Sequence, residues 1–167
     1  MTTRTQAPVT TQVYRVYIKA TPEAIWNAIT RPEWTRRYGY GISAEYDLRP
    51  GGAYRALTSE EMRKQGAPEV AVDGEVIEAD PPRRLVQTWR MVMDPATEAE
   101  GFTRLTHEIE ATTGGVTKLT IVHDVAGAPR LAALLAGEME NEGADGGWSW
   151  VLSDLKTLLE TGSRLAG

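Results

Sequence analysis

One amphipathic segment near the C-terminus constrains the fold of this chain more than any other feature. Between Trp148 and Leu159, apolar side chains recur with the period of one helix face, and polar side chains fall on the opposite face. Gly146 and Gly147 precede the segment and Gly162 follows it, as is common at helix ends. Such a helix of roughly 15 residues is about 22 Å long, and its apolar stripe needs a partner surface of similar length.

Most of the chain before that helix has the pattern of an antiparallel meander. Short runs rich in β-branched and aromatic residues are separated by turn sequences that contain Gly and Pro, and the connections suit antiparallel pairing. The predicted strands cover residues 13–19, 45–48, 53–58, 70–79, 85–93, 104–111 and 116–123. The longer polar connections, 59–69 and 94–101, are predicted to be loops.

Two short helices are predicted between the first and second strands. Thr21 is suited to cap the first helix, Pro22 to its first turn, and Glu23 to the positive end of its dipole. The segment 30–34 repeats the pattern of a polar cap followed by proline, which predicts a break and a second helix. With only one crossover that contains helices, a parallel doubly wound sheet is excluded.

Composition indicates one soluble domain. A chain of 167 residues fits a single domain, which we place at 12–163 behind a disordered tail, 1–11. No apolar stretch approaches the roughly 20 residues of a membrane span, and the polar start lacks a secretory signal, so we expect a cytoplasmic protein. The net charge of −5 argues against a nucleic-acid partner, and the absence of cysteine excludes disulfide and thiolate chemistry.

The predicted fold is α+β, with a curved seven-stranded antiparallel sheet wrapped around the long C-terminal helix. One face of such a sheet needs cover, and a single helix cannot fill the whole concave face. We therefore expect a pocket between the sheet and the helix. The segment 128–142 predicts a further short helix that serves as a lid or a dimer contact, and the chain is expected to be a monomer or a homodimer.

Several motifs, in order along the chain, resemble a known family. They are Lys19-Ala20-Thr21-Pro22-Glu23-Ala24-Ile25-Trp26, Asp47-Leu48-Arg49-Pro50-Gly51-Gly52, Gly74-Glu75-Val76, Asp80-Pro81-Pro82-Arg83-Arg84-Leu85 and Gly147-Trp148. The chain resembles the family named after the activator of heat-shock protein 90 ATPase homologue, within the START-like, birch-pollen-allergen-like helix-grip (SRPBCC) superfamily. The resemblance implies the helix-grip fold. It leaves function open, because that superfamily includes lipid carriers, hormone receptors and polyketide cyclases.

Two histidines are candidates for polar chemistry inside the pocket. Strand alternation places His107 and His123 on the apolar faces of adjacent strands, close together if the hairpin loop between them has an odd number of residues. A histidine pKa lies near working pH, so both are candidates for ligand contact or proton transfer. The alternative is a structural hydrogen bond to backbone or loop. Two histidines without cysteine or short ligand spacing do not predict a metal site.

Other predicted ligand contacts are aromatic or amide side chains. Gln87 and Trp89 share one strand face, where an apolar pocket needs a few orienting polar groups. Tyr54, Trp34 and Tyr38 are candidates for an aromatic rim, with core packing as the alternative. Trp148 is a candidate at the start of the long helix, again with a core role as the alternative.

The function predicted first is binding of a small hydrophobic or aromatic molecule, without a cofactor. The first alternative is a cyclase, dehydratase or hydrolase that acts on a polyketide-like substrate through the two histidines. The second alternative is a co-chaperone-like interaction module that uses the outer sheet face or the segment 131–139. The sequence shows no nucleophile elbow, phosphate loop or dinucleotide fingerprint.

Overall fold

The computed structural model describes residues 10–138 and 146–165, and these form a curved antiparallel sheet with helices on its inner face. The seven strands lie in the order β1-β7-β6-β5-β4-β3-β2. Their bounds are β1 Thr11–Ile18, β2 Ser43–Tyr46, β3 Ala53–Leu57, β4 Val70–Asp80, β5 Arg84–Met91, β6 Thr103–Ala111 and β7 Thr117–Asp124. The predicted fold is confirmed. Strand β1 begins at the last residue of the predicted tail, and residues 1–9 of that tail lie outside the described residues.

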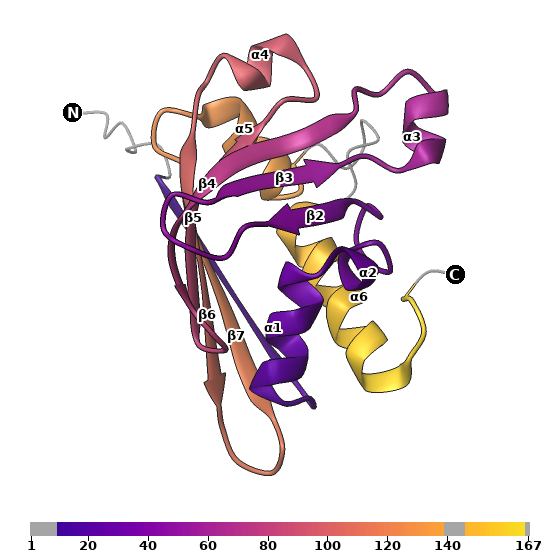
Figure 1. The fold of residues 1–167 in the computed structure, drawn as a ribbon, viewed down its shortest axis with the longest axis vertical. Coiled ribbons are helices and arrows are strands. Elements are labelled where there is room, and N and C mark those ends of the chain that lie inside the picture. The colour runs from indigo at the N-terminus through magenta and orange to yellow at the C-terminus, as the bar shows by residue number, and fades with distance from the viewer. Residues whose placement is uncertain (1–9, 139–145, 166–167) are drawn as a thin grey trace, which may run out of the picture.

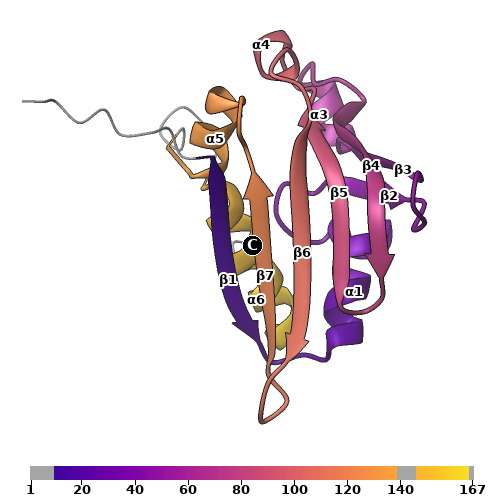
Figure 2. The same cartoon turned by 90° about the vertical axis from the view of Figure 1, so that its left-hand side faces the viewer.

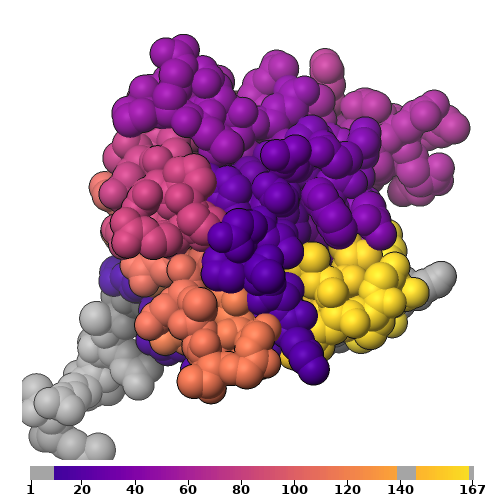
Figure 3. All heavy atoms as spheres, turned by 60° about the horizontal axis from the view of Figure 1, so that its bottom comes forward, coloured from indigo at the N-terminus to yellow at the C-terminus, as the bar shows by residue number. Residues whose placement is uncertain are grey.

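The helices divide into those that cover the sheet and those that lie in its connections. Helices α1 and α6 lie behind the sheet in Figure 2, on the face that the sheet curls around. The bounds are α1 Pro22–Thr30, α2 Pro32–Thr35, α3 Glu60–Lys64, α4 Pro95–Glu98, α5 Pro129–Leu135 and α6 Gly147–Thr161. Seen from the end that carries the β6–β7 hairpin, the atoms of the α1 region fill the space between that hairpin and α6 (Figure 3).

The first helices form as the sequence predicts. The side chain of Thr21 accepts a hydrogen bond from the backbone N–H of Ala24 at 3.1 Å, which caps α1. Pro32 opens α2 after the chain has left the helical conformation at Arg31. The Tyr38 hydroxyl then donates to the carbonyl oxygen of Ala28 at 2.8 Å, which fixes the chain after α2 against α1.

Helix α6 packs on the inner face near β1 and ends at Gly162, whose φ of 82° is the left-handed conformation that favours glycine. Its apolar face is interrupted by Asp154, which is fully buried. The two carboxylate oxygens of Asp154 accept hydrogen bonds from the backbone N–H groups of Gly39 and Leu165, each at 2.8 Å. This carboxylate therefore holds the loop after α2 and the chain after α6 onto the helix.

Both connections that the sequence predicted to be loops contain a short helix instead. Ser59 caps α3 through a hydrogen bond from Met62 N at 3.2 Å, and Asp94 caps α4 through one from Thr97 N at 2.9 Å. Each helix is only four or five residues long, too short to show a helical period. The short helix predicted in the segment 128–142 is present as α5, and the part of that segment beyond residue 138 lies outside the described residues.

The outer face of the sheet is a surface of paired charges. The carboxylates of Asp73, Glu108 and Glu110 pair with cations on neighbouring strands at distances of 2.7 to 3.2 Å. These groups are partly or fully exposed, so the pairs contribute little to stability. Among the described residues, no helix is long and apolar enough to span a membrane.

Candidate functional site

The candidate site lies on the inner face of three adjacent strands, β5, β6 and β7, where polar side chains interrupt an apolar wall. The strand register puts Gln87, Leu105 and His123 side by side on β5, β6 and β7. His107 lies two residues along β6 from Leu105, diagonal to both polar neighbours. Gln87 and His123 are fully buried, and His107 is 5% exposed. Three polar side chains thus surround one leucine in the core.

Only the oxygen atom of the Gln87 side-chain amide has a hydrogen-bond partner. The hydroxyl of Tyr46 donates to Gln87 Oε1 at 2.7 Å. The rings of Tyr46 and Tyr54 pack against each other with centroids 4.5 Å apart. Burial raises the pKa of both phenols, so both are neutral. Gln87 Nε2 is buried without a hydrogen-bond partner, which leaves two N–H donors unpaired in the core.

His123 is engaged at both ring nitrogens. The indole N–H of Trp148 donates to His123 Nδ1 at 3.2 Å, and Nε2 lies 2.7 Å from Thr103 Oγ1. Because the Thr103 hydroxyl donates its own hydrogen to the carbonyl oxygen of Trp89 at 2.8 Å, we assign the His123 proton to Nε2. Burial, with a smaller effect of His107, lowers the pKa of His123 to about 3. The ring is therefore a neutral structural bridge.

His107 is buried but incompletely paired. Burial lowers the pKa of His107 to about 4, against a smaller opposing effect of hydrogen bonding to the Leu85 backbone. Its Nδ1 atom is buried without a partner. Of the two ring nitrogens only Nδ1 is buried without a partner, and an N–H at that position would have no acceptor, so we assign the proton to Nε2. His107 Nδ1 is then a free acceptor at neutral pH.

The structure brings most of the predicted contact residues together. Gln87, Trp89, His107, His123 and Trp148 lie together; the His123 ring is 5.2 Å from that of Trp89 and 6.1 Å from that of Trp148, centroid to centroid. Tyr54 joins this group through Tyr46.

Trp34 lies on α2 and Tyr38 just after it, and Tyr38 is near Tyr46 and Tyr54. Tyr38 is buried with its hydroxyl bonded to the α1 backbone, so it belongs to the core rather than to an aromatic rim. The guanidinium of Arg37 covers the Trp34 ring at 4.6 Å from its centroid. Neither aromatic ring shares a hydrogen bond or ring contact with Gln87 or the two histidines.

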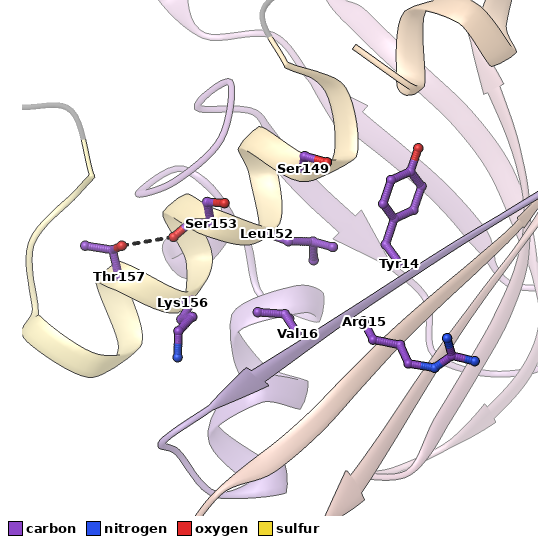
Figure 4. Close-up of a pocket in the computed structure, with 8 residues that line it drawn as sticks. All are labelled: Tyr14, Arg15, Val16, Ser149, Leu152, Ser153, Lys156 and Thr157. Carbon is purple, nitrogen blue, oxygen red and sulfur yellow. Dashed lines mark hydrogen bonds between the residues drawn. The ribbon is translucent and has the colours of Figure 1, made fainter.

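Two hollows in the described part of the chain are open grooves on the surface. The larger, of about 310 Å³, lies between the free edge of β1 and α6, and Tyr14, Val16 and Leu152 project into it (Figure 4). The second, of about 270 Å³, lies beside Phe102 on the outer face. None of the predicted contact residues lines either groove. Core side chains cover the inner face of the sheet.

Strand register relates the first groove to the site. Tyr14 pairs with Ile121, which pairs in turn with His107. The groove wall at Tyr14 is therefore two strand spacings, about 10 Å, from His107, and Ile121 is the residue between them in that row. Ile121 is 1% exposed and belongs to the core cluster.

Two residues of the site escaped the sequence analysis. Tyr46 contacts Gln87 because β2 and β3 curl over the inner face of the sheet. No local sequence pattern predicts that curl. Thr103 begins β6 with an inward side chain, and strand alternation back from Leu105 would have found it. Among the described residues, no group of three or more His, Asp or Glu side chains is placed to hold a metal ion.

A family model and several solved structures match this chain. The model described as "Activator of Hsp90 ATPase homolog 1-like protein" matches residues 19–160. No curated protein sequence matches. CalU16 from Micromonospora echinospora is similar at 22% identity and a TM-score of 0.60, over 89% of this chain and 73% of that one.

Two further structures have the same architecture. Protein MLL2253 from Mesorhizobium loti matches at 22% identity and a TM-score of 0.64, over 89% of this chain and 96% of that one. PFC0360w, an Hsp90 activator from Plasmodium falciparum, matches at 22% identity and a TM-score of 0.55, over 94% of this chain and 91% of that one. At these identities the structural likeness establishes the fold alone.

Proposed function

Because the chain belongs to the family of Activator of Hsp90 ATPase homolog 1-like proteins, whose fold wraps a sheet around a helix, we propose that it binds a small hydrophobic molecule between the inner sheet face and α6. One observation carries the proposal. Gln87 Nε2 and His107 Nδ1 are buried on adjacent strands without partners. Each unpaired buried polar atom costs about 1 to 3 kcal/mol, and a bound ligand that pairs them recovers that cost.

The surroundings of these two atoms suit an apolar ligand body. Val76, Leu85 and Leu105 flank Gln87 and His107 on the inner face, and all three are buried. A few polar groups placed in an apolar wall are the usual composition of a small-molecule site. The ring pair of Tyr46 and Tyr54 adds flat aromatic surface beside Gln87.

The β1–α6 groove is the proposed route to this site. It opens between the sheet and α6, and in the Tyr14 row one core residue, Ile121, separates it from His107. The inner face is closed by core side chains in this structure, so binding requires Ile121 and the core side chains around it to move aside. In this proposal the ligand enters through the groove, and Gln87 and His107 form its polar contacts.

The histidines support recognition rather than acid–base catalysis. His123 uses both ring nitrogens in structural hydrogen bonds. His107 has a pKa lowered by burial to about 4, well below the near-neutral value that suits a general base. A neutral imidazole that offers one acceptor is instead a binding group.

Native mass spectrometry of the purified protein, compared with the same sample after denaturation in solvent, tests this proposal. We expect a species heavier than the chain that releases a small molecule on denaturation. The Gln87→Leu variant should retain less of it, whereas Thr106→Val, on the outer face of the sheet, should retain as much as the wild type. If the wild type carries no ligand and takes up none from a panel of apolar compounds, the proposal is wrong.

A further inference from the structure

The two unpartnered atoms of the inner face are one donor and one acceptor. Gln87 Oε1 is occupied by the Tyr46 hydroxyl, so the open position of the amide is the Nε2 donor. Because His107 Nδ1 is buried where an N–H would find no acceptor, the proton is assigned to Nε2 and Nδ1 is an acceptor. A ligand that satisfies both must accept one hydrogen bond and donate another.

These two atoms belong to side chains at diagonal positions on adjacent strands. Gln87 pairs with Leu105 across β5 and β6, and His107 follows two residues along β6. Diagonal positions of this kind have backbones about 7 to 8 Å apart, a gap that inward-pointing glutamine and histidine side chains narrow. A single ligand hydroxyl placed between the two side chains would accept from Gln87 Nε2 and donate to His107 Nδ1.

Among the residues that the structure describes, the inner face carries no charge free to hold an ionic group. His107 and His123 are neutral, and burial raises the pKa of Tyr38, Tyr46 and Tyr54. The buried carboxylate of Asp154 is already committed to Gly39, Arg164 and Leu165. A charged ligand group would therefore lose its hydration without gaining a counter-charge.

We infer that the ligand is an uncharged alcohol or phenol on an otherwise apolar body, with its hydroxyl oxygen accepting from Gln87 Nε2 and its hydrogen donated to His107 Nδ1. This inference rests on the proposed function and names the ligand chemistry of the same site. A ketone or an ether pairs with Gln87 only and leaves His107 Nδ1 unpaired. A hydrocarbon pairs with neither atom.

Four probes of similar size test the inference: 2-naphthol, 2-methoxynaphthalene, 2-methylnaphthalene and 2-naphthoate, measured by calorimetric or fluorescence titration at neutral pH. We expect 2-naphthol to bind about 10- to 100-fold more tightly than 2-methylnaphthalene, the ether to fall between them, and the carboxylate to bind least. Gln87→Leu and His107→Leu should each reduce the preference for the hydroxyl, and Thr106→Val should preserve it.

The outcomes separate this inference from the proposed function. Equal binding of 2-naphthol and 2-methylnaphthalene overturns the hydroxyl inference and leaves apolar binding intact. Binding of none of the four contradicts both. Nitrogen-15 NMR of the wild-type histidines adds a test that needs no variant: a His107 ring with its proton on Nδ1 overturns the inference whatever binds.

Discussion

The hydroxyl of Tyr46 lies 2.7 Å from Oε1 of Gln87, although the two residues are 41 positions apart. This contact turns the amide so that its nitrogen has no partner in the core. The polar pair therefore makes an incomplete network, which costs stability. Under the proposed function, a bound ligand group completes this network.

The first prediction concerns the stability of this pair. Tyr46→Phe alone leaves both ends of the Gln87 amide unpaired and should lower the free energy of unfolding by about 1 to 3 kcal/mol. The double variant Tyr46→Phe/Gln87→Leu replaces the polar pair by apolar groups of similar size and should be at least as stable as the wild type. Urea unfolding measures both. A double variant less stable than Tyr46→Phe alone would contradict the account.

The second prediction is a pH dependence of stability. Burial lowers the pKa of His107 to about 4 and that of His123 to about 3 in the folded protein, below the usual value of about 6.5. As pH falls below that value, the unfolded chain binds protons that the folded chain does not, so stability decreases. Between pH 6.5 and pH 4, each histidine should lower the free energy of unfolding by about 2 to 3 kcal/mol.

Chemical unfolding at a series of pH values checks this dependence. The His107→Leu variant should show a shallower loss of stability over the same range, because one of the two groups is gone. Thr106→Val, whose side chain lies on the opposite face of β6, should match the wild-type slope. An unchanged slope in His107→Leu would show that His107 is not the buried neutral group described above.

The third prediction concerns Asp154. Asp154→Asn leaves one acceptor oxygen for the two backbone N–H groups of Gly39 and Leu165. We expect a loss of about 2 to 4 kcal/mol in the free energy of unfolding. Ser153→Asn, at the neighbouring exposed position of α6, should change stability by less than about 0.5 kcal/mol. Similar losses in both variants would contradict the role given to this carboxylate.

The fourth prediction concerns access from the β1–α6 groove. Ile121→Ala removes the side chain between Tyr14 and His107 in one cross-strand row, at a cost of about 2 to 5 kcal/mol in stability. The space should admit an apolar probe, so 2-methylnaphthalene should bind this variant more tightly and more rapidly than the wild type. Val122→Ala, on the outer face, is the control. Stopped-flow fluorescence that shows no faster association would exclude this route.

The sequence predicted the elements whose signal is local. The helical period of Leu152, Leu155 and Leu158 identified α6, and strand alternation put Gln87 and both histidines on the inner face. Helices α3 and α4 were missed because they have only four or five residues.

Features that depend on distant contacts could not be predicted in this way. The contact between Tyr46 and Gln87 depends on the curl of β2 and β3, and the pairing of Asp154 depends on where Gly39 and Leu165 come to lie. Sequence reasoning also expected a pocket between the sheet and α6, whereas the groove found there among the described residues, between β1 and α6, is open to the surface. Whether an enclosed pocket remains depends on how completely the side chains fill the assembled core, and strand alternation does not predict that.

The most direct test of the central claim is an isotope-filtered NOE experiment on the wild-type protein with bound 2-naphthol. The account predicts contacts from the ligand ring protons to Leu105, Val76 and Tyr54, together with shifts of the Gln87 side-chain amide and the His107 ring nitrogens. Contacts confined to Tyr14, Val16 and Leu152 would place the ligand in the surface groove and contradict a binding site on the inner face of the sheet.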